Sequence, residues 1–423
     1  MLTTWDRSEK VTTTEATTWS TLPSEVIRLV LQNCSFYELG TVGQVERRAR
    51  QTARDLICSE EWLCIPSNRQ AAQAALWRGK CARFVVAELA GHGGAVRSIS
   101  ACLGRVATGS DDRRCTLLPS ALTVRRSTCI LHRREVTCVA LCSDSTRLAT
   151  GGSDGVVRVF GVGEGVGQGR VIASQCQHEL MVDRSFEPVT SIVRSLAWAD
   201  ASLYCGMMGG GPYRWHLPTS VVESPPASAE VARSPHEAAT VALAVDGPLV
   251  VSGAHDCTVR LWTTPTAPLD CRAILHGHRG AVSSVCASNA HSLVVSGSFD
   301  RTIRLWDVRS GCCTASLPSG GRVRSLALCG AVLASSSEDE THISVWDVTV
   351  VGDGADGRRA QLMATLDGEH QGTITALAVD GDGGRIVSGD IWGMTRIWLP
   401  CAERAERWAC KEYGRPRAVG GEV

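Results

Sequence analysis

The chain has 423 residues, with 43 basic and 43 acidic side chains that leave no formal net charge at pH 7. This length is too great for one compact core and suits a small domain joined to a larger one. A net charge of zero provides no overall attraction to nucleic acid or to an anionic membrane. No apolar run in the sequence approaches the ~20 residues of a membrane-spanning helix. We therefore expect neither nucleic acid nor a membrane as a partner.

Residues 1–19 are polar and rich in threonine, and they contain no apolar core of a signal peptide. A segment so poor in core-forming residues is predicted to be disordered. The 19 cysteines of the chain include no CxxC pair, and Cys102, Cys142 and Cys329 occupy repeat-equivalent positions. These features favour buried, reduced thiols in a protein of the cytoplasm and/or nucleus, with no metal site and no cofactor.

Residues 20–65 predict a small helical unit. Pro23 suits the first turn of a helix, because its missing N–H is not needed there, and Glu25 is favourable in the same turn. Apolar residues then recur four positions apart, as in Ile27 and Leu31, and give the helix a broad apolar face. A unit of about 45 residues can hardly bury a core of its own. The apolar face therefore predicts a partner.

The same segment resembles the F-box. Leu-Pro-x-Glu at its start, the apolar helix, a second apolar segment, a run of arginines and a closing tryptophan carry the resemblance. In that family the motif docks on the adaptor subunit of SCF-type cullin–RING ubiquitin ligases. The resemblance implies that the adaptor-binding residues are Leu22, Pro23, Glu25, Ile27, Leu31, Leu39 and Trp62. The chain departs from the pattern at Ala49, where an aromatic residue is usual, and at Thr52, where leucine is common.

The rest of the chain is organised around a repeat, which is clearest at residues 277–307. Two alternating segments and a polar turn at Asp300 lead to a third segment that ends at Trp306, as in an antiparallel meander. The closing position recurs as Leu118, Phe160, Trp215, Trp262, Trp346 and Trp398. The opening histidine recurs as His92, His132, His236 and His370. The turn aspartate recurs as Asp112, Asp154, Asp256 and Asp339. The sequence therefore predicts seven similar sheets.

This repeat resembles that of the WD-repeat β-propeller family, in which a His, a Ser or Thr, an Asp and a Trp of each blade form a hydrogen-bonded set. The resemblance implies complete sets in the fourth blade (His236, Ser252, Asp256, Trp262) and the fifth (His278, Ser296, Asp300, Trp306). The remaining blades depart from the pattern: the third has Gly209 for the Asp, the sixth has Ser319 for the His, and the seventh has Trp392 for the Asp. We expect these residues to be structural, because they recur once in each repeat.

Two further segments join the parts. Residues 66–80 are rich in alanine and glutamine and predict a helical linker. Residues 81–89 alternate as a strand does, and we predict that they form the outer strand of the last blade beside residues 395–399. Closing the ring in this way would remove exposed sheet edges.

The expected architecture is an α+β multidomain chain with a small helical F-box, a linker helix and a seven-bladed all-β WD-repeat propeller. The expected domains are a disordered N-terminus (1–19), the F-box (20–65), the linker (66–80), the propeller (81–400, with its closing strand at 81–89) and a flexible C-terminal tail (401–423).

The mouth of the propeller channel is the expected substrate site. In phosphate-binding members of the WD-repeat family, arginines at the start of the innermost strands crowd this mouth. The resemblance implies a substrate-binding rim of Arg97, Arg194, Arg324, His255 and Phe299. Two interpretations stay open. The arginines bind a phosphorylated substrate, because guanidinium pairs with phosphate through two hydrogen bonds, or they pair with carboxylates of their own blades, such as Asp111 and Glu338.

No Ser/His/Asp or Cys/His set stands apart from the repeats, so we expect no catalytic residues. The two resemblances together imply a substrate-recognition subunit of an SCF-type ubiquitin ligase, with the adaptor, a cullin and a protein substrate as partners. The alternative is a WD-repeat scaffold for complex assembly that has no ligase role.

Overall fold

The computed structural model describes residues 83–89, 91–118, 127–164, 171–181, 192–217, 229–232, 235–263, 269–338, 340–348, 360–367, 370–380, 385–400 and 417–420. The chain divides into two units, residues 1–72 and residues 73–423, and all described residues belong to the second. The expected disordered segment 1–19, the F-box 20–65 and the linker 66–80 therefore lie outside the described residues, as does Asp339.

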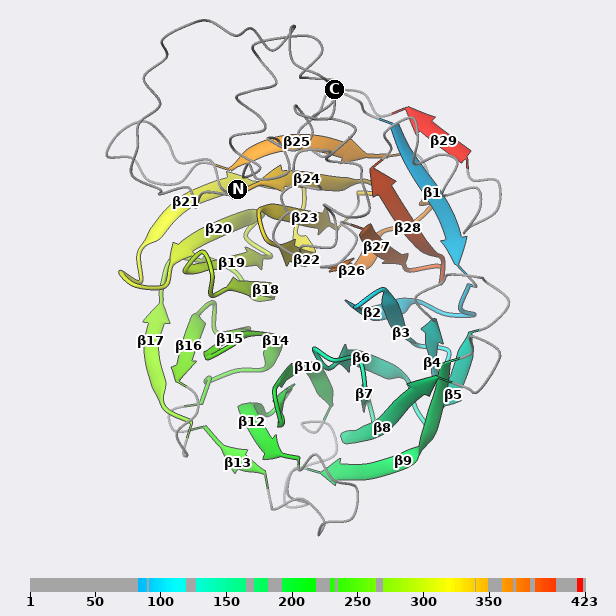
Figure 1. The fold of residues 1–423 in the computed structure, drawn as a ribbon. Coiled ribbons are helices and arrows are strands. Elements are labelled where there is room, and N and C mark those ends of the chain that lie inside the picture. Colours follow the sequence, from blue (N-terminus) through cyan, green and yellow to red (C-terminus); the bar gives the residue numbers. More distant parts are fainter. Residues whose placement is uncertain are drawn as a thin grey trace, which may run out of the picture. The chain divides into compact units, whose positions relative to one another are not determined.

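The described residues form seven antiparallel sheets, which we call blades one to seven (Figure 1). The innermost strands are β2 (Val96–Cys102), β6 (Val136–Leu141), β10 (Val193–Ala199), β14 (Thr240–Asp246), β18 (Val282–Ser288), β22 (Val323–Cys329) and β26 (Ile374–Asp380). The second strands are β3 (Arg105–Ser110), β7 (Arg147–Gly152), β11 (Ser202–Met207), β15 (Leu249–Ala254), β19 (Leu293–Ser298), β23 (Val332–Ser337) and β27 (Arg385–Asp390). The third strands are β4 (Arg114–Leu118), β8 (Val156–Glu164), β12 (Gly210–His216), β16 (Val259–Thr263), β20 (Thr302–Asp307), β24 (Ile343–Asp347) and β28 (Thr395–Pro400). The outer strands of blades one to six are β5 (Thr128–Leu131), β9 (Val171–Met181), β13 (Glu230–Val231), β17 (Cys271–Leu275), β21 (Cys313–Pro318) and β25 (Gln361–Leu366).

The seven blades close into a ring. Each innermost strand contacts the innermost strand of the next blade, and β26 of blade seven contacts β2 of blade one. This is the seven-bladed all-β propeller that the repeat predicted (Figure 1). Ring closure lets every sheet pack both faces against a neighbour, which no single blade could do alone.

Blade seven is completed by strands from both sides of the repeat region. The sequence predicted an outer strand at residues 81–89, and β1 (Arg83–Leu89) pairs antiparallel with β28, with Leu89 opposite Thr395. A fifth strand, β29 (Arg417–Gly420), pairs with the other side of β1. The expectation of a flexible tail at 401–423 is therefore wrong for residues 417–420. As an outer strand, β1 presents unpaired backbone groups, and β29 satisfies them.

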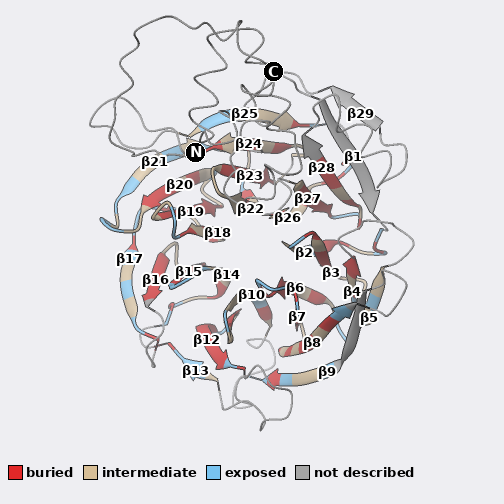
Figure 2. Ribbon diagram, in the orientation of Figure 1, coloured by how far each residue is buried: buried red, intermediate tan, exposed pale blue. Residues whose placement is uncertain are grey.

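The core lies between the blades, where the first three strands are mostly buried and the outer strands alternate with exposed positions (Figure 2). Blades approach closely at one position near the end of each second strand, and this position is glycine in every blade except the sixth. A Cβ atom on Gly297 of blade five would lie 2.4 Å from Cγ1 of Val323 in blade six. Real atoms do not approach so closely, so glycine is required there. In blade six Ser336 takes the equivalent place, and its hydroxyl donates to the carbonyl of Ile374 at 3.2 Å.

Candidate protein-binding site

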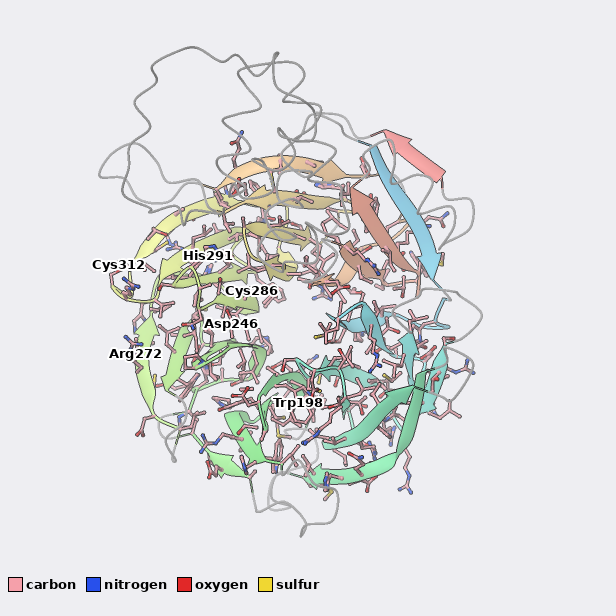
Figure 3. All side chains as sticks on the ribbon, viewed as in Figure 1. Trp198, Asp246, Arg272, Cys286, His291 and Cys312 are labelled. Atoms are coloured by element: carbon pink, nitrogen blue, oxygen red, sulfur yellow. The ribbon has the colours of Figure 1, made fainter. Side chains whose placement is uncertain are left out.

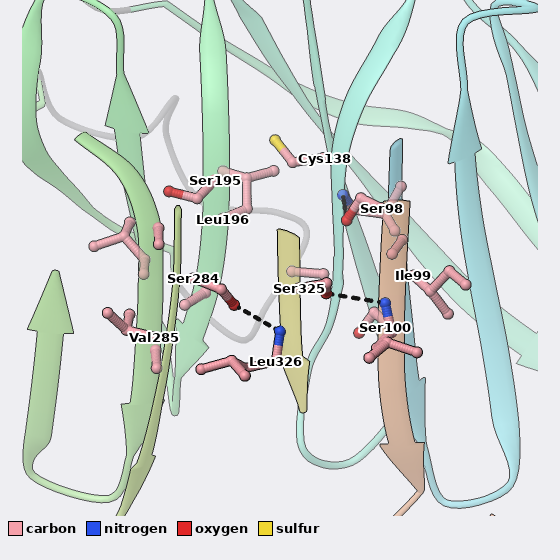
Figure 4. Close-up of a pocket in the computed structure, with 18 of the residues that line it drawn as sticks. Ser98, Ile99, Ser100, Cys138, Ser195, Leu196, Ser284, Val285, Ser325 and Leu326 are labelled. Carbon is pink, nitrogen blue, oxygen red and sulfur yellow. Dashed lines mark hydrogen bonds between the residues drawn. The ribbon is translucent and has the colours of Figure 1, made fainter. Parts of the chain in front are cut away.

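A cavity of about 440 Å³ lies where the seven innermost strands meet (Figure 4). One residue near the start of each innermost strand sits at a shift in the pairing register, and these seven residues all line the cavity: Arg97, Thr137, Arg194, Val241, Ser283, Arg324 and Thr375. A β-bulge re-aims the side chain of the extra residue. The bulges thus turn one side chain of every blade toward the central channel.

Hydroxyl groups among these residues connect neighbouring blades. Ser283 donates to the carbonyl of Val323 at 2.6 Å, and Thr137 donates to that of Val193 at 2.5 Å. One position further along, Ser284 accepts a hydrogen bond from the backbone N–H of Leu326 at 3.0 Å (Figure 4). These hydroxyls bond to neighbouring blades, and the charged members of the seven are the three arginines.

The three rim arginines differ in their partners. Arg97 makes two hydrogen bonds to the carboxylate of Asp111, at 2.8 and 2.6 Å, and this hydrogen bonding raises the arginine pKa. Arg194 is exposed, and its Nη2 lies 3.6 Å from the sulfur of Met208. Arg324 is half-buried and makes no ion pair with any residue of the described part of the chain. The ion-pair interpretation therefore describes Arg97 and does not extend to the other two.

The carboxylate expected to pair with Arg324 has another partner. Glu338 lies 3.6 Å from Nη1 of Arg322, the residue before β22, and not beside Arg324. The guanidinium of Arg322 also lies over the ring of Phe299, 5.8 Å from its centroid. Phe299 is half-buried, whereas His255, the other predicted rim contact, is exposed on the β15–β16 turn. Both lie on turns at the same end of the blades as the arginines, and neither lines the cavity itself.

Behind the rim, blade five contains a chain of four hydrogen-bonded side chains. Nδ1 of His278 lies 2.8 Å from Oδ2 of Asp300, and Nε2 lies 2.7 Å from the hydroxyl of Ser296. The indole N–H of Trp306 donates to the same hydroxyl at 2.8 Å. Each buried polar group therefore has a partner, which burial requires.

The aspartate of this chain stays ionised. Burial alone would raise the pKa of Asp300, but hydrogen bonds from the hydroxyl of Thr302, the N–H of Arg279 and the ring of His278 outweigh it and hold the pKa at about 2. Burial conversely lowers the pKa of His278, against the opposing effect of Asp300. A neutral imidazole between a carboxylate and a hydroxyl is a structural arrangement that ties the β19–β20 turn to the loop before β18.

Blade four has the same arrangement. Nδ1 of His236 lies 2.8 Å from Asp256, and its Nε2 lies 2.6 Å from Ser252, to which Trp262 donates at 2.8 Å. Blade one has the first three members, with His92 bonded to Asp112 at 3.0 Å and to Thr108 at 2.7 Å. Leu118 stands at the tryptophan position of that blade.

The prediction that blade seven lacks its aspartate is wrong. His370 bonds to Asp390 at 2.8 Å and to Ser388 at 2.6 Å, and Trp398 donates to Ser388 at 2.7 Å. Asp390 stands two residues before the expected position, but its carboxylate reaches the same histidine and also accepts from two backbone N–H groups of its own turn. Trp392, at the expected position, is consequently 69% exposed. The sequence did contain a signal for this aspartate, because Asp390 directly follows Ser388 and Gly389.

In blade two the histidine has lost its partner. Asp154 pairs with Arg158 at 2.9 Å instead, and Nε2 of His132 is buried without a hydrogen bond to any described residue. Burial, together with the nearby Arg158, lowers the pKa of His132 to about 4. The set is thus complete in blades four, five and seven, whereas blade two keeps His132, Thr150 and Asp154 without the bond between His132 and Asp154 and has Phe160 in place of the tryptophan.

The family model of the WD40 repeat (WD domain, G-beta repeat) matches residues 124–161, 233–263, 269–307 and 360–398. The chain contains WD40 repeats. These four matches fall on blades that the structure places in the seven-bladed ring, and the unmatched blades have the same strand order. No curated protein matches the chain. A WD40 propeller of this kind is an interaction platform for other proteins.

Two observations on the described residues bear on other expectations. Their cysteines are free thiols, from Cys286 on the innermost strand β18, where burial raises the pKa to about 12, to the exposed Cys312 at the β20–β21 turn (Figure 3). Within the same residues no group of His, Cys, Asp and Glu could hold a metal ion, and no helix could span a membrane.

Proposed function

We propose that this WD40 protein is the substrate-recognition subunit of an SCF-type cullin–RING ubiquitin ligase. Residues 20–65 would dock on the adaptor as an F-box, and the propeller mouth would bind the protein substrate. The observation that carries the proposal is the sequence Leu22-Pro23-x-Glu25, followed by apolar residues four positions apart, ahead of a closed WD40 propeller. The chain would supply proximity and orientation, and bound partners would supply catalysis.

The test is co-purification of the tagged full-length chain with adaptor and cullin. Replacing Leu22 and Pro23 by alanine should abolish the association, while Thr12→Ala with Thr13→Ala, outside the motif, should leave it intact. Thermal unfolding of the propeller should be the same in both variants. Absence of adaptor and cullin from the unmodified protein would instead favour a WD40 scaffold without a ligase role.

The arginine rim supports a substrate that carries negative charge. Arg324 makes no ion pair within the described residues and Arg194 is exposed, so both are available to an incoming carboxylate or phosphate. Binding of captured substrate should fall on phosphatase treatment and in Arg194→Ala and Arg324→Ala. Arg97→Ala should have a smaller effect, because that side chain is already paired with Asp111. Unchanged binding after dephosphorylation would exclude a phosphorylated substrate.

We also propose a cytoplasmic or nuclear location. Thirteen cysteines of the described part of the chain are unbridged, which suits a reducing compartment. Microscopy of a fluorescently tagged chain tests this, and appearance in the secretory pathway would contradict it.

A further inference from the structure

Four arginines gather on the upper face of blades one and two, where upper denotes the end that bears the histidine loops and aspartate turns. Arg113 lies on the turn between β3 and β4 and Arg114 begins β4, while Arg133 and Arg134 lie on the connection between β5 and β6. All four side chains are exposed. None of them belongs to the channel rim, which is formed by the innermost strands.

Backbone contacts bring the two arginine pairs together. The N–H of His132 donates to the carbonyl of Arg113 at 2.8 Å, and Arg114 of β4 stands opposite Leu131 of β5. The loop that bears Arg133 and Arg134 is thereby fixed beside the turn that bears Arg113 and the start of β4, which bears Arg114. Like charges so placed repel one another, so the protein maintains this cluster against an electrostatic cost.

The neighbouring carboxylates have hydrogen-bond partners of their own and form no ion pair with the cluster within the described residues. Glu135 accepts from the hydroxyl of Ser153, and that bond, with a smaller effect of Arg134 and Arg113, lowers its pKa. Asp112 is bonded to His92 and to the N–H of Gly93, at 3.0 Å each. Within the described residues none of the four arginines makes an ion pair.

Blade five shows that the architecture does not require this cluster. Arg301 occupies the same turn position as Arg113, with φ of 67° against 65°, and its carbonyl accepts the equivalent bond from the N–H of Ser319 at 2.9 Å. The facing loop there carries Gly320 and Gly321 where blade two has its arginine pair. The positive cluster is therefore a feature of this one junction.

An exposed apolar side chain lies further along the same face. Blades seven, one and two follow one another round the ring (Figure 1). Trp392, displaced from the polar set by Asp390, is 69% exposed, and the neighbouring Ile391 is 44% exposed. Their turn contacts the next loop through the N–H of His92, which donates to Gly393 at 2.8 Å.

That loop in turn leads to the arginines. Its residues Gly93 and Gly94 carry no side chains, and the N–H of Gly93 donates to Asp112, the residue before Arg113. These contacts place the turn that bears Trp392, the glycine loop and the turn that bears Arg113 next to one another in that order, and the indole of Trp392 lies over Gly372 in the loop before β26.

We propose that this surface, consisting of Arg113, Arg114, Arg133, Arg134 and Trp392, docks an extended acidic protein segment that carries an apolar side chain. Tryptophan and arginine are the residues that most often anchor protein interfaces, and arginine pairs with carboxylates through two hydrogen bonds. Asp111, Asp112 and Glu135 lie next to the arginines in the sequence, and a peptide can place single acidic side chains at the arginines and away from these carboxylates, whereas the evenly spaced charges of a phosphodiester backbone cannot. The inference rests on the protein-binding role of the propeller and not on the F-box.

The experiment measures fluorescence anisotropy of three labelled probes with the full-length chain. The probes are a glutamate-rich peptide with one leucine, the same peptide with glutamine for glutamate, and oligothymidylate. We expect the acidic peptide to bind, and Arg133→Glu with Arg134→Glu to weaken it at least about tenfold, because like charges then face each other. Trp392→Ala should weaken it several-fold.

The matched control is Arg279→Glu with Arg301→Glu, which reverses two exposed upper-face arginines that lie outside the cluster. This variant should bind the acidic peptide within about twofold of the unmodified chain, since neither residue lies in the proposed surface and a charge outside the contact contributes little. An equal loss in the control, or equal binding of the glutamine peptide, would overturn the proposal. Tighter binding of oligothymidylate, lost in the same arginine variants, would make the surface a nucleic-acid site and also overturn it. Adaptor co-purification of each variant separates this result from the fate of the ligase proposal.

Discussion

Blades five and three have the same strand order and a buried tryptophan at the same position of the third strand, but they differ behind that tryptophan. In blade five Trp306 donates to Ser296, which continues to His278 and Asp300. In blade three Cys205 stands at the serine position, opposite Tyr213 of β12, the strand that carries Trp215. Both tryptophans are nonetheless buried. The comparison indicates that apolar packing suffices to complete the ring, while the polar set fixes the upper turns of individual blades.

The junction between blades five and six also has more polar contacts than the junction between blades three and four. Ser284 of blade five accepts a hydrogen bond from the N–H of Leu326 in blade six. Ser195 is the equivalent residue of blade three, but its hydroxyl is buried without a hydrogen bond to any described residue, as is the hydroxyl of Thr240 in blade four. Buried polar groups without partners cost stability. The junction between blades three and four is therefore held mainly by packing.

The largest expected effect is the loss of either tryptophan. Trp306→Ala and Trp215→Ala should each lower the free energy of unfolding by about 3–5 kcal/mol, since both remove a large buried side chain. Trp306→Ala should cost about 1 kcal/mol more, because it also deprives Ser296 of a hydrogen bond. Urea denaturation followed by circular dichroism measures the difference. Equal losses would mean that the polar set adds nothing to blade five.

A second test asks whether blade seven belongs with blade five. Asp390→Ala should cost about 2 kcal/mol, because His370 and two backbone N–H groups lose their buried partner. Trp392→Ala, at the position where the repeat pattern expects the aspartate, should stay within about 0.5 kcal/mol, as exposed side chains usually do. The reverse order in the same denaturation assay would restore the assignment made from the sequence.

Acidification should affect blade two, whose histidine lacks a carboxylate partner. The pKa of His132 falls from its ordinary value of 6.5 to about 4 in the folded protein. Between these values the unfolded chain binds a proton that the folded chain does not, so the free energy of unfolding should decrease as the pH falls from 6.5 towards 4. His132→Gln should flatten this dependence, whereas His276→Gln at an exposed position should not. Identical pH profiles of the unmodified chain and His132→Gln would refute the assignment.

The smallest expected effect concerns the blade junctions. Ser284→Ala should destabilise by about 1 kcal/mol, because the N–H of Leu326 loses its acceptor. Ser195→Ala removes a hydroxyl that has no partner and should be neutral or slightly stabilising. Thermal unfolding of the two variants side by side makes the comparison. A larger loss from Ser195→Ala would show that its hydroxyl is satisfied in solution.

The sequence predicted the number of blades and the position that closes each of them because those features depend on local alternation and turn chemistry. The seven predicted closing positions, from Leu118 to Trp398, all occupy the same place in the third strand of their blades. The sequence also predicted the position of the outer strand β1, because the exposed edge of the last blade needs a strand that pairs with its backbone N–H and C=O groups.

What the sequence could not predict depends on side-chain reach and on pairing between distant segments. Asp390 was missed because a carboxylate displaced by two residues still reaches His370, a fact of three-dimensional geometry that residue spacing conceals. Asp154 pairs with Arg158, so His132 has no carboxylate partner although the histidine and the aspartate of the pattern are both present in the sequence. The arginine cluster arises where the ring brings two loops together. The sequence of either loop alone does not indicate the cluster.

The pairing of strand β1 with β28 affects how the protein folds during translation. It is synthesised before any blade, yet its partner β28 emerges about 300 residues later. At roughly 5–20 residues per second this strand waits roughly 15–60 s for its partner. During that interval blades one to six accumulate as an open arc with two unprotected ends, and the nascent chain carries an unpaired β-forming segment. Chaperones that shield exposed strands during translation should therefore change the yield of folded protein more than they change the stability of the folded state.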